Sequence, residues 1–399
     1  MDTMELLMPA GDMEKLKIAI RFGADAVYLG GPTMQLRAAN TGFSMQALAE
    51  AIAYAHVQEK KVYVAVNAFA DNRDIDRATD YAKALNDLSA DAVIVSDLGM
   101  LRRIKKSAPN LEVHISTQAN CLNYEAACAY YELGAKRIVL GREMPLADIG
   151  ALSDKTPTDL ELEAFVHGAM CMSYSGRCMI SAYLTGRSAN KGGCTQSCRW
   201  NYALLEETRP NQFMQVYEDE AGTAILSAYD LNMIQHLDEL SRCGITSVKV
   251  EGRMKTAYYV ATVANAYRRA IDESAPMQTL LDELECVSHR PYSTGFYLGK
   301  PETDKKAGDG YIQSCLFCAV VLQDAENGRI FIEQRNRIRE GDTVEVISPT
   351  HMGAKFVIGN IRSEDGQPLD AIVSPMQRAA VDCPYPLVQG DMLRIRAAS

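Results

Sequence analysis

Short apolar runs alternate with amphipathic segments through the first 260 residues of the chain. The runs favour β-branched side chains, and eight of them occur, at residues 5–8, 26–29, 62–66, 92–95, 113–116, 137–140, 163–166 and 247–250. Parallel strands that are buried on both faces have this continuous apolar character. The pattern therefore predicts eight buried parallel strands.

Helical segments separate these runs. Apolar residues recur at helical spacing in Met13–Arg21, Met45–Gln58 and Arg77–Leu88, and small-residue turns at 23–25, 89–91 and 134–136 lead into the next strand. Eight such βα units predict an α/β protein with a (β/α)8 TIM-like barrel rather than an open doubly wound sheet. No Gly-x-Gly-x-x-Gly follows an early strand, so a dinucleotide-binding fold has little support.

The pattern changes twice along the chain. A long cysteine-rich insertion, at about residues 168–245, separates the seventh and eighth runs, and it includes an extra segment from Thr223 to Leu240. After Ala270 the chain becomes turn-rich, and short alternating strands with Gly-Asp turns follow from Ile312 onward. We therefore predict a barrel with its insertion at 1–275, a linker at 276–310 and a small C-terminal antiparallel β-barrel at 311–399.

Charge and hydropathy narrow the class of protein. The formal net charge of −10, from 41 Lys and Arg against 51 Asp and Glu, argues against a generally basic nucleic-acid binder. A local basic groove remains compatible with it. The first residues lack the basic and apolar regions of a secretory signal, and no apolar stretch is long enough to span a bilayer. We expect a cytoplasmic protein with no membrane partner.

The cysteines supply the clearest chemistry. Of 11 in the chain, four cluster within a glycine-rich and polar stretch: Cys171, Cys178, Cys194 and Cys198. Four thiolates suit Zn²⁺ or an iron–sulfur cluster. Structural zinc usually takes two closely spaced pairs, whereas here only the last two cysteines are close, so the spacing favours iron–sulfur with zinc as the alternative. Packing roles are expected for Cys121, Cys128, Cys243, Cys286 and Cys383, and for the Cys315-x-x-Cys318 pair on an apolar strand.

Polar residues follow most of the predicted strands. They are Asn67, Asp97, Gln118, Arg142, Glu143, His167, Glu251, Arg253 and Lys255. The carboxyl ends of barrel strands meet at one face, so these side chains should form a mixed-charge pocket. Arg253 and Lys255 suit a carboxylate or a phosphate. His167 fits an acid–base role, a supporting role or a core position, and Asn67 and Asp97 fit helix caps equally well.

Peptidase motifs are missing from the sequence. It has no His-Glu-x-x-His and no Gly-x-Ser-x-Gly. Cys171 with His167 as its base would resemble a cysteine peptidase, but this pairing leaves three neighbouring cysteines unexplained.

Several motifs together identify a family. They are Met-Pro-Ala-Gly-Asp at 8–12, Ala-Asp-Ala-Val-Tyr-Leu-Gly at 24–30, Ser-Thr-Gln-Ala-Asn at 116–120, the stretch at 165–178, Cys-Thr-Gln-Ser-Cys-Arg-Trp at 194–200 and Lys-Val-Glu-Gly-Arg-Met-Lys at 249–255. With them the chain resembles the collagenase-like peptidase family, number thirty-two of the unassigned types. Despite that name, the resemblance implies hydroxylation of RNA or of a quinone precursor.

The turn at His289–Phe296 and the single C-terminal β-barrel are most similar to the tRNA-acting branch of the family. This resemblance implies that the chain forms 5-hydroxyuridine at the tRNA wobble position, with a [4Fe-4S] cluster on the four cysteines and prephenate as an anionic cosubstrate. It also implies that His167 or Glu251 moves protons. The substrate-binding candidates are Arg37, Asn67, Gln118, Arg142, Glu143, Asp230, Arg253 and Lys255.

Two departures from the tRNA-acting relatives leave other substrates open. The segment after Trp200 is short, and Tyr229 precedes Asp230 where a lysine is common. The alternatives are a peptidase, a hydroxylase of ribosomal RNA or another substrate, and a zinc-stabilised RNA-binding protein. A partner subunit is compatible with all of them. An RNA partner needs basic groups, which we expect beside the cysteines (Arg177, Arg187, Lys191, Arg199, Arg209) and along one face of a strand (Arg335, Arg337, Arg339).

Overall fold

A computed structural model of the 399-residue chain describes residues 4–35, 42–170, 185, 187, 195, 217–219, 222–224, 229–299 and 312–396. These residues form two compact units. One comprises the described residues within 1–16, 24–254 and 290–310, and the other comprises those within 17–23, 255–289 and 311–399. The domain boundaries expected at residues 275 and 310 stay predictions. No helix in the described ranges is long and apolar enough to cross a membrane.

Eight parallel strands close into a barrel in the first unit, which confirms the predicted α/β-barrel fold. Each strand pairs with its neighbour in sequence, and the last pairs with both the first and the seventh, in the order β11-β1-β2-β3-β4-β5-β6-β7. The strands are β1 (Glu5–Pro9), β2 (Ala26–Gly30), β3 (Lys61–Val66), β4 (Ala92–Val95), β5 (Glu112–Ile115), β6 (Arg137–Val139), β7 (Glu161–Ala169) and β11 (Ile245–Val250).

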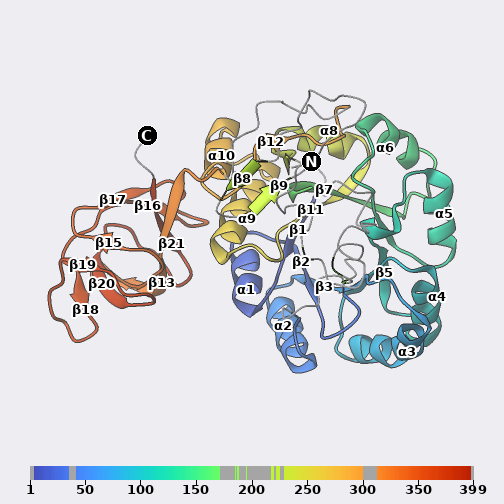
Figure 1. Ribbon diagram of the computed structural model, residues 1–399, viewed down its shortest axis with the longest axis horizontal. Helices are drawn as coiled ribbons and strands as arrows, with labels where there is room; N and C mark the ends of the chain where they lie inside the picture. The colour runs from blue at the N-terminus through green and yellow to red at the C-terminus, as the bar shows by residue number, and fades with distance from the viewer. Residues whose placement is uncertain are drawn as a thin grey trace. The chain divides into compact units, whose positions relative to one another are not determined.

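Helices follow the strands in sequence, as the amphipathic pattern predicts. Figure 1 shows α2–α6 on the outside of the strands. The helices are α1 (Met13–Arg21), α2 (Met45–Val57), α3 (Asn72–Asp87), α4 (Leu98–Ser107), α5 (Tyr124–Glu132), α6 (Leu146–Ser153), α8 (Leu237–Arg242), α9 (Ala257–Ile271) and α10 (Met277–Leu284). Side chains start several of them: Asp71 forms a capping box on α3, and Asp97 accepts from Met100 N–H at the start of α4. Asp97 is therefore a helix cap.

The seventh strand extends beyond the barrel ladder. At nine residues β7 is longer than the other barrel strands, and its last part pairs antiparallel with β10 (Asp230–Asn232), which lies within the predicted extra segment. A further short strand, β12 (Tyr292–Ser293), then pairs with β10. Strand β7 thus carries added structure at its carboxyl end. A small hairpin, β8 (Tyr217–Asp219) and β9 (Gly222–Ala224), completes the described strands of the insertion.

The second unit contains an antiparallel sheet that curls as a half-barrel. Its seven strands run in the order β17-β16-β21-β13-β14-β20-β18. Their bounds are β13 (Cys315–Glu326), β14 (Arg329–Gln334), β16 (Thr343–Ile347), β17 (Lys355–Val357), β18 (Arg362–Ser363), β20 (Arg378–Asp382) and β21 (Met392–Arg396), with a separate pair β15 (Ile338–Arg339) and β19 (Ala371–Ile372). The sheet surrounds an apolar core that includes Ile332, Val346 and Leu393.

The predicted row of arginines on one strand face is wrong. Strand β14 ends at Gln334, and the chain bends at Arg335 and Asn336 before Arg339 enters β15. The Arg335 side chain donates to Glu333 at 2.7 Å, so it neutralises a local carboxylate. Alternation in sequence cannot place these residues on one face because the strand does not continue through them.

A buried arginine fixes α10 to this sheet. Arg394 on β21 is fully buried, and its guanidinium donates to both carboxylate oxygens of Glu283 on α10. It also donates to Glu345 on β16 at 2.9 Å, and Glu345 accepts from Arg396 as well. Removing one partner from such a network would leave a buried charge uncompensated, so the three side chains hold α10 and the sheet in one arrangement.

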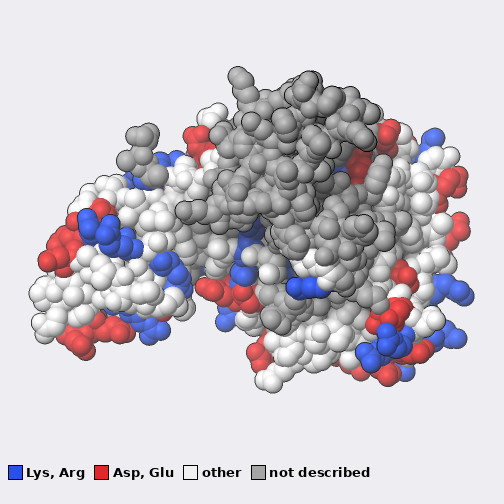
Figure 2. Space-filling view, in the orientation of Figure 1, with Lys and Arg blue, Asp and Glu red and all other residues white. Residues whose placement is uncertain are grey.

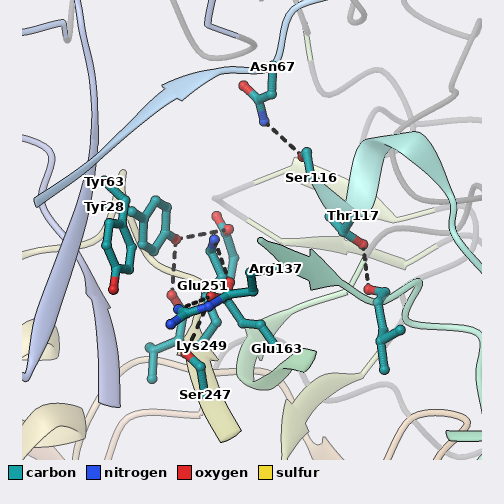
Figure 3. Close-up of polar contacts among 12 residues, drawn as sticks. Tyr28, Tyr63, Asn67, Ser116, Thr117, Arg137, Glu163, Ser247, Lys249 and Glu251 are labelled. Atoms are coloured by element: carbon teal, nitrogen blue, oxygen red, sulfur yellow. Dashed lines mark hydrogen bonds and ion pairs between the residues drawn. The ribbon is translucent and has the colours of Figure 1, made fainter. Parts of the chain in front are cut away.

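The interior of the barrel also contains charged groups (Figure 3). Glu163 on β7 is fully buried, and it accepts from Lys249 at 2.9 Å and from Arg137 at 3.0 Å. Arg137 also pairs with Glu5, whose carboxylate accepts from Tyr63. These side chains come from β1, β3, β6, β7 and β11, so the charge cluster connects strands from around the barrel.

The positive charges determine the protonation of this cluster. Burial alone would raise the pKa of the Glu163 carboxyl, but the charges of Lys249 and Arg137 outweigh it and lower that pKa to about 2. Burial lowers the pKa of His114, which lies edge-on to the Tyr63 ring at 4.7 Å. The interior therefore contains a charged carboxylate between two cations, beside a buried imidazole whose pKa is lowered.

Glu163 should contribute to the acid sensitivity of the protein. Its pKa falls from 4.5 to about 2 on folding, so its contribution is present above about pH 4.5 and is lost as the pH falls towards 2. The full contribution is about 3 kcal/mol. We expect Glu163→Gln to flatten the fall of the unfolding free energy across this window, measured by urea unfolding of the full chain at several pH values. Glu125→Gln, an exposed change on α5, is the control, and an unchanged slope in Glu163→Gln would contradict the assignment.

Candidate functional site

Most of the polar residues predicted at strand ends do meet at one end of the barrel. Asn67 follows β3, Gln118 lies in the 3-10 turn Thr117–Ala119 after β5, and Arg142 and Glu143 follow β6. His167 lies near the end of β7, and Glu251 follows β11 directly. Because all eight strands are parallel and the barrel is closed, these positions share its carboxyl-end mouth.

Arg142 is held in place on three sides. One guanidinium nitrogen donates to the Ala169 carbonyl at 2.9 Å, and the group lies over the Phe165 ring at 3.9 Å. Another nitrogen is 4.0 Å from a Glu251 carboxylate oxygen. Phe165 also has Lys249 at 5.5 Å from its ring centroid. The ring thus links the charge cluster inside the barrel to the arginine at the mouth.

Glu251 lies at the centre of these contacts. Its carboxylate is 3.4 Å from the Tyr28 hydroxyl, which donates to the Val250 carbonyl at 3.0 Å (Figure 3). Its backbone N–H donates to the His167 carbonyl at 2.8 Å. Tyr28 in turn has the Lys249 ammonium at 4.4 Å from its ring centroid. A nearly buried carboxylate beside a phenol and a guanidinium is suited to accept or hold a proton.

His167 is also brought to the mouth. It is 1% exposed, and its ring lies 5.3 Å from the Tyr292 ring on β12. The strand pair β7–β10 places it opposite Asn232. A buried imidazole at the mouth, beside the Tyr292 ring, suits a role in proton movement as well as packing.

Two glycines make room for Arg253. It is 6% exposed, and its guanidinium donates to the side-chain oxygen of Gln35. A Cβ on Gly30 would overlap this Gln35 oxygen, and a Cβ on Gly11 would overlap the Arg253 carbonyl. Gly30 therefore lets the Gln35 and Arg253 side chains approach the backbone of β2, and Gly11 lets the Arg253 backbone approach the chain just after β1.

Lys255 and Asp230 make other contacts. The Lys255 ammonium donates to the Ser288 carbonyl at 3.1 Å and lies over the Tyr259 ring, both within the second unit. Asp230 is 2% exposed, and its carboxylate accepts two bonds from the Arg290 guanidinium at 2.7 and 2.9 Å. This ion pair fixes the turn that begins at Arg290 to β10. A direct role of either residue in binding a substrate stays a prediction.

Asn67 and Gln118 border the opposite part of the mouth. Asn67 donates to the Ser116 hydroxyl at 3.4 Å (Figure 3). Ser116 also accepts from the Gln118 backbone. The side-chain oxygen of Gln118 is buried and has no hydrogen-bond partner in the described structure. A donor from a bound molecule would satisfy it.

The proposed metal ligands cannot be placed. Cys171, Cys178, Cys194, Cys198 and the substrate candidate Arg37 lie outside the described residues. Within the described ranges, no three or more His, Cys, Asp or Glu side chains are grouped so as to hold a metal ion. The described mouth thus offers polar and ionisable groups, and a metal centre would depend on the four cysteines.

Sequence reasoning missed several residues of this site. Tyr28, Phe165 and Lys249 lie within apolar runs, where they read as strand core. Strand alternation could have identified them, because every second side chain of a barrel strand points into the barrel. A charged side chain at such a position needs a partner of opposite charge. Gln35 carried no such signal.

Comparison with known proteins shows the family. Residues 11–307 match Peptidase family U32, and residues 313–394 match the Peptidase family U32 C-terminal domain. The tRNA hydroxylation protein P1 of Bacillus subtilis is 37% identical over 98% of this chain and 94% of its own. The 23S rRNA 5-hydroxycytidine C2501 synthase of Escherichia coli is 37% identical over 67% of this chain and 39% of its own. A collagenase of Porphyromonas gingivalis is 30% identical over 87% of both chains. The chain therefore belongs to peptidase family U32.

Proposed function

We propose that this chain is an iron–sulfur-dependent tRNA hydroxylase that forms 5-hydroxyuridine at the wobble position. The observation that carries the proposal is the end-to-end similarity to a tRNA hydroxylation protein, across both the barrel and the C-terminal domain. The similarity to the ribosomal RNA hydroxylase spans a smaller share of the chain, and that to the collagenase is lower in identity.

The barrel mouth supports this chemistry. Glu251, with Tyr28 and Arg142 around it, would accept the proton that leaves the reacting base, and the buried His167 is a second group that would move protons at the mouth. Arg142 and Arg253 would bind the carboxylates of a small anionic cosubstrate such as prephenate. The two arginines would bind any small anion of suitable shape, so they do not identify the cosubstrate. The tRNA substrate and the anionic cosubstrate are therefore separate parts of the proposal.

The four cysteines support an iron–sulfur centre by their chemistry. Thiolates are soft ligands, and four of them match the ligand set of a [4Fe-4S] cluster. The first, Cys171, follows the end of β7 by two residues in sequence. The cluster, when bound, would supply one-electron chemistry, while residues of the mouth position the substrate and move protons.

A tRNA partner needs basic groups on the surface. Figure 2 shows that Lys and Arg side chains are mixed with Asp and Glu over the described part of the face in view. Small local groups of Lys and Arg side chains would therefore have to contact the tRNA phosphates. The exposed Arg337 and Arg339 of the second unit are candidates for such contacts.

The first experiment tests the substrate and the role of Glu251. A bacterial strain without its own wobble-uridine hydroxylation would be complemented with wild-type protein, Glu251→Gln or the surface control Asp148→Asn, and nucleosides of its tRNA and ribosomal RNA would be quantified. We expect wild type and the control to restore 5-hydroxyuridine in tRNA. Glu251→Gln should hydroxylate on the order of 100-fold more slowly, because a positioned acid–base group contributes at least that much.

Other outcomes separate the alternatives. New hydroxylation found only in ribosomal RNA would show that ribosomal RNA, and not tRNA, is the substrate. Cleavage of denatured collagen by the purified protein, without any change in RNA, would support the peptidase.

The second experiment tests the metal centre. Protein purified without oxygen should be brown and contain about four iron and four sulfide per chain. Cys194→Ser should lose the colour and the iron, whereas Cys128→Ser, a change on α5, should keep both. A colourless wild-type protein that contains zinc would contradict the hydroxylase mechanism and favour the zinc-stabilised RNA-binding protein.

A further inference from the structure

Two cysteines that are distant in sequence are brought together in the second unit. Cys286 follows the end of α10 and Cys315 begins β13, and both are at least 98% buried. The Ser314 hydroxyl, next to Cys315, donates to the Glu285 carbonyl, next to Cys286, at 2.8 Å, and the two thiols interact with each other. Both remain free thiols in this structure.

The Cys315-x-x-Cys318 spacing suggests a different partner, but the two cysteines have different surroundings in the fold. Cys318 belongs to the apolar core of the sheet, where it packs among residues such as Ile332 and Val346, and its thiol contacts the Leu316 carbonyl at 3.2 Å. Cys315 does not belong to this core. The thiol of Cys315 instead interacts with that of Cys286, which follows α10.

The surroundings distinguish the two thiols. The interaction with Cys286 lowers the pKa of Cys315, and the charges of Arg394 and Arg396 lower it further. Arg396 is the neighbour of Cys315 across the strand pair β13–β21. The Cys286 thiol donates to the Asp282 carbonyl at 3.3 Å, and the interaction with Cys315 together with burial raises the pKa of Cys286. Glu283 and Glu345 also lie at these arginines, so the local charge is balanced rather than purely positive.

We propose that Cys286 and Cys315 are a peroxide-reactive thiol pair that closes into an intramolecular disulfide. The Cys315 thiolate attacks one oxygen of hydrogen peroxide, the O–O bond breaks, and the departing hydroxide takes a proton to become water. Cys286 then attacks the sulfur of the Cys315 sulfenic acid as a thiolate. The S–S bond forms, and the released hydroxide takes the proton that Cys286 lost. Two thiols and one peroxide give one disulfide and two waters.

Burial selects the oxidant. Thiols that are almost inaccessible admit a molecule as small as a peroxide more readily than a bulky disulfide, whose attack needs access for both partners. Arg394 keeps the two cysteines near each other, since it binds Glu283 on α10 and lies on β21, which pairs with β13. The disulfide would covalently connect the end of α10 to the start of the sheet.

The test uses the full-length protein and three variants. Wild type, Cys286→Ser, Cys315→Ser and the control Cys318→Ser would be treated with hydrogen peroxide, alkylated and digested without reduction for mass spectrometry. We expect a cross-linked 286–315 peptide in wild type and in Cys318→Ser, lighter than the sum of its parts by two hydrogens. In Cys286→Ser, dimedone should trap a sulfenic acid at Cys315. Oxidised wild type should also melt at a higher temperature than reduced, a shift reversed by reductant and lacking in Cys286→Ser.

The wild-type protein decides the result even if a variant fails to fold. A cross-link from Cys315 to Cys318, or peroxide treatment that leaves Cys286 and Cys315 as thiols while other cysteines oxidise, would overturn the proposal. Peptide mapping separates this site from the four cysteines of the insertion.

Discussion

The site depends on an ion pair inside the barrel, between Glu163 and Lys249. Neither charge could be buried alone, and each is tolerated because the closed ring of strands brings the other, together with Arg137, within hydrogen-bonding distance. Lys249 also contacts the faces of Tyr28 and Phe165. The Tyr28 ring carries the hydroxyl beside Glu251, and the Phe165 ring lies under Arg142. The positions of these two polar groups at the mouth therefore depend on the ion pair inside the barrel.

The mouth itself joins groups of different chemistry on one scaffold. Glu251, Arg142 and His167 come from β11, the β6 end and β7, and their contacts run through Tyr28, Phe165 and backbone carbonyls. Rigid strands and aromatic rings hold each group at a defined distance from the next. Such pre-organisation is what proton transfer and anion binding require.

A buried ion-pair network around Arg394 organises the second unit, as the Glu163–Lys249 pair does in the barrel. Arg394 satisfies Glu283 and Glu345, and this network joins α10 to the antiparallel sheet. The same contact brings the Cys286 thiol to Cys315. A structural ion pair thereby creates a place where thiol chemistry can occur, because it fixes two cysteines that the chain separates by 29 positions.

The sequence by itself determined the eight barrel strands, most of the helices and the strand-end location of Asn67, Gln118, Arg142, His167 and Glu251. Those features follow from local periodicity and from the rule that parallel strands present their carboxyl ends together. Only the tertiary structure decided which side chains contact each other. The pairing of Lys249 with Glu163, of Asp230 with Arg290 and of Cys315 with Cys286 rather than Cys318 joins residues from different elements. Sequence spacing carries no information on such contacts, because barrel closure and sheet curvature set which side chains meet.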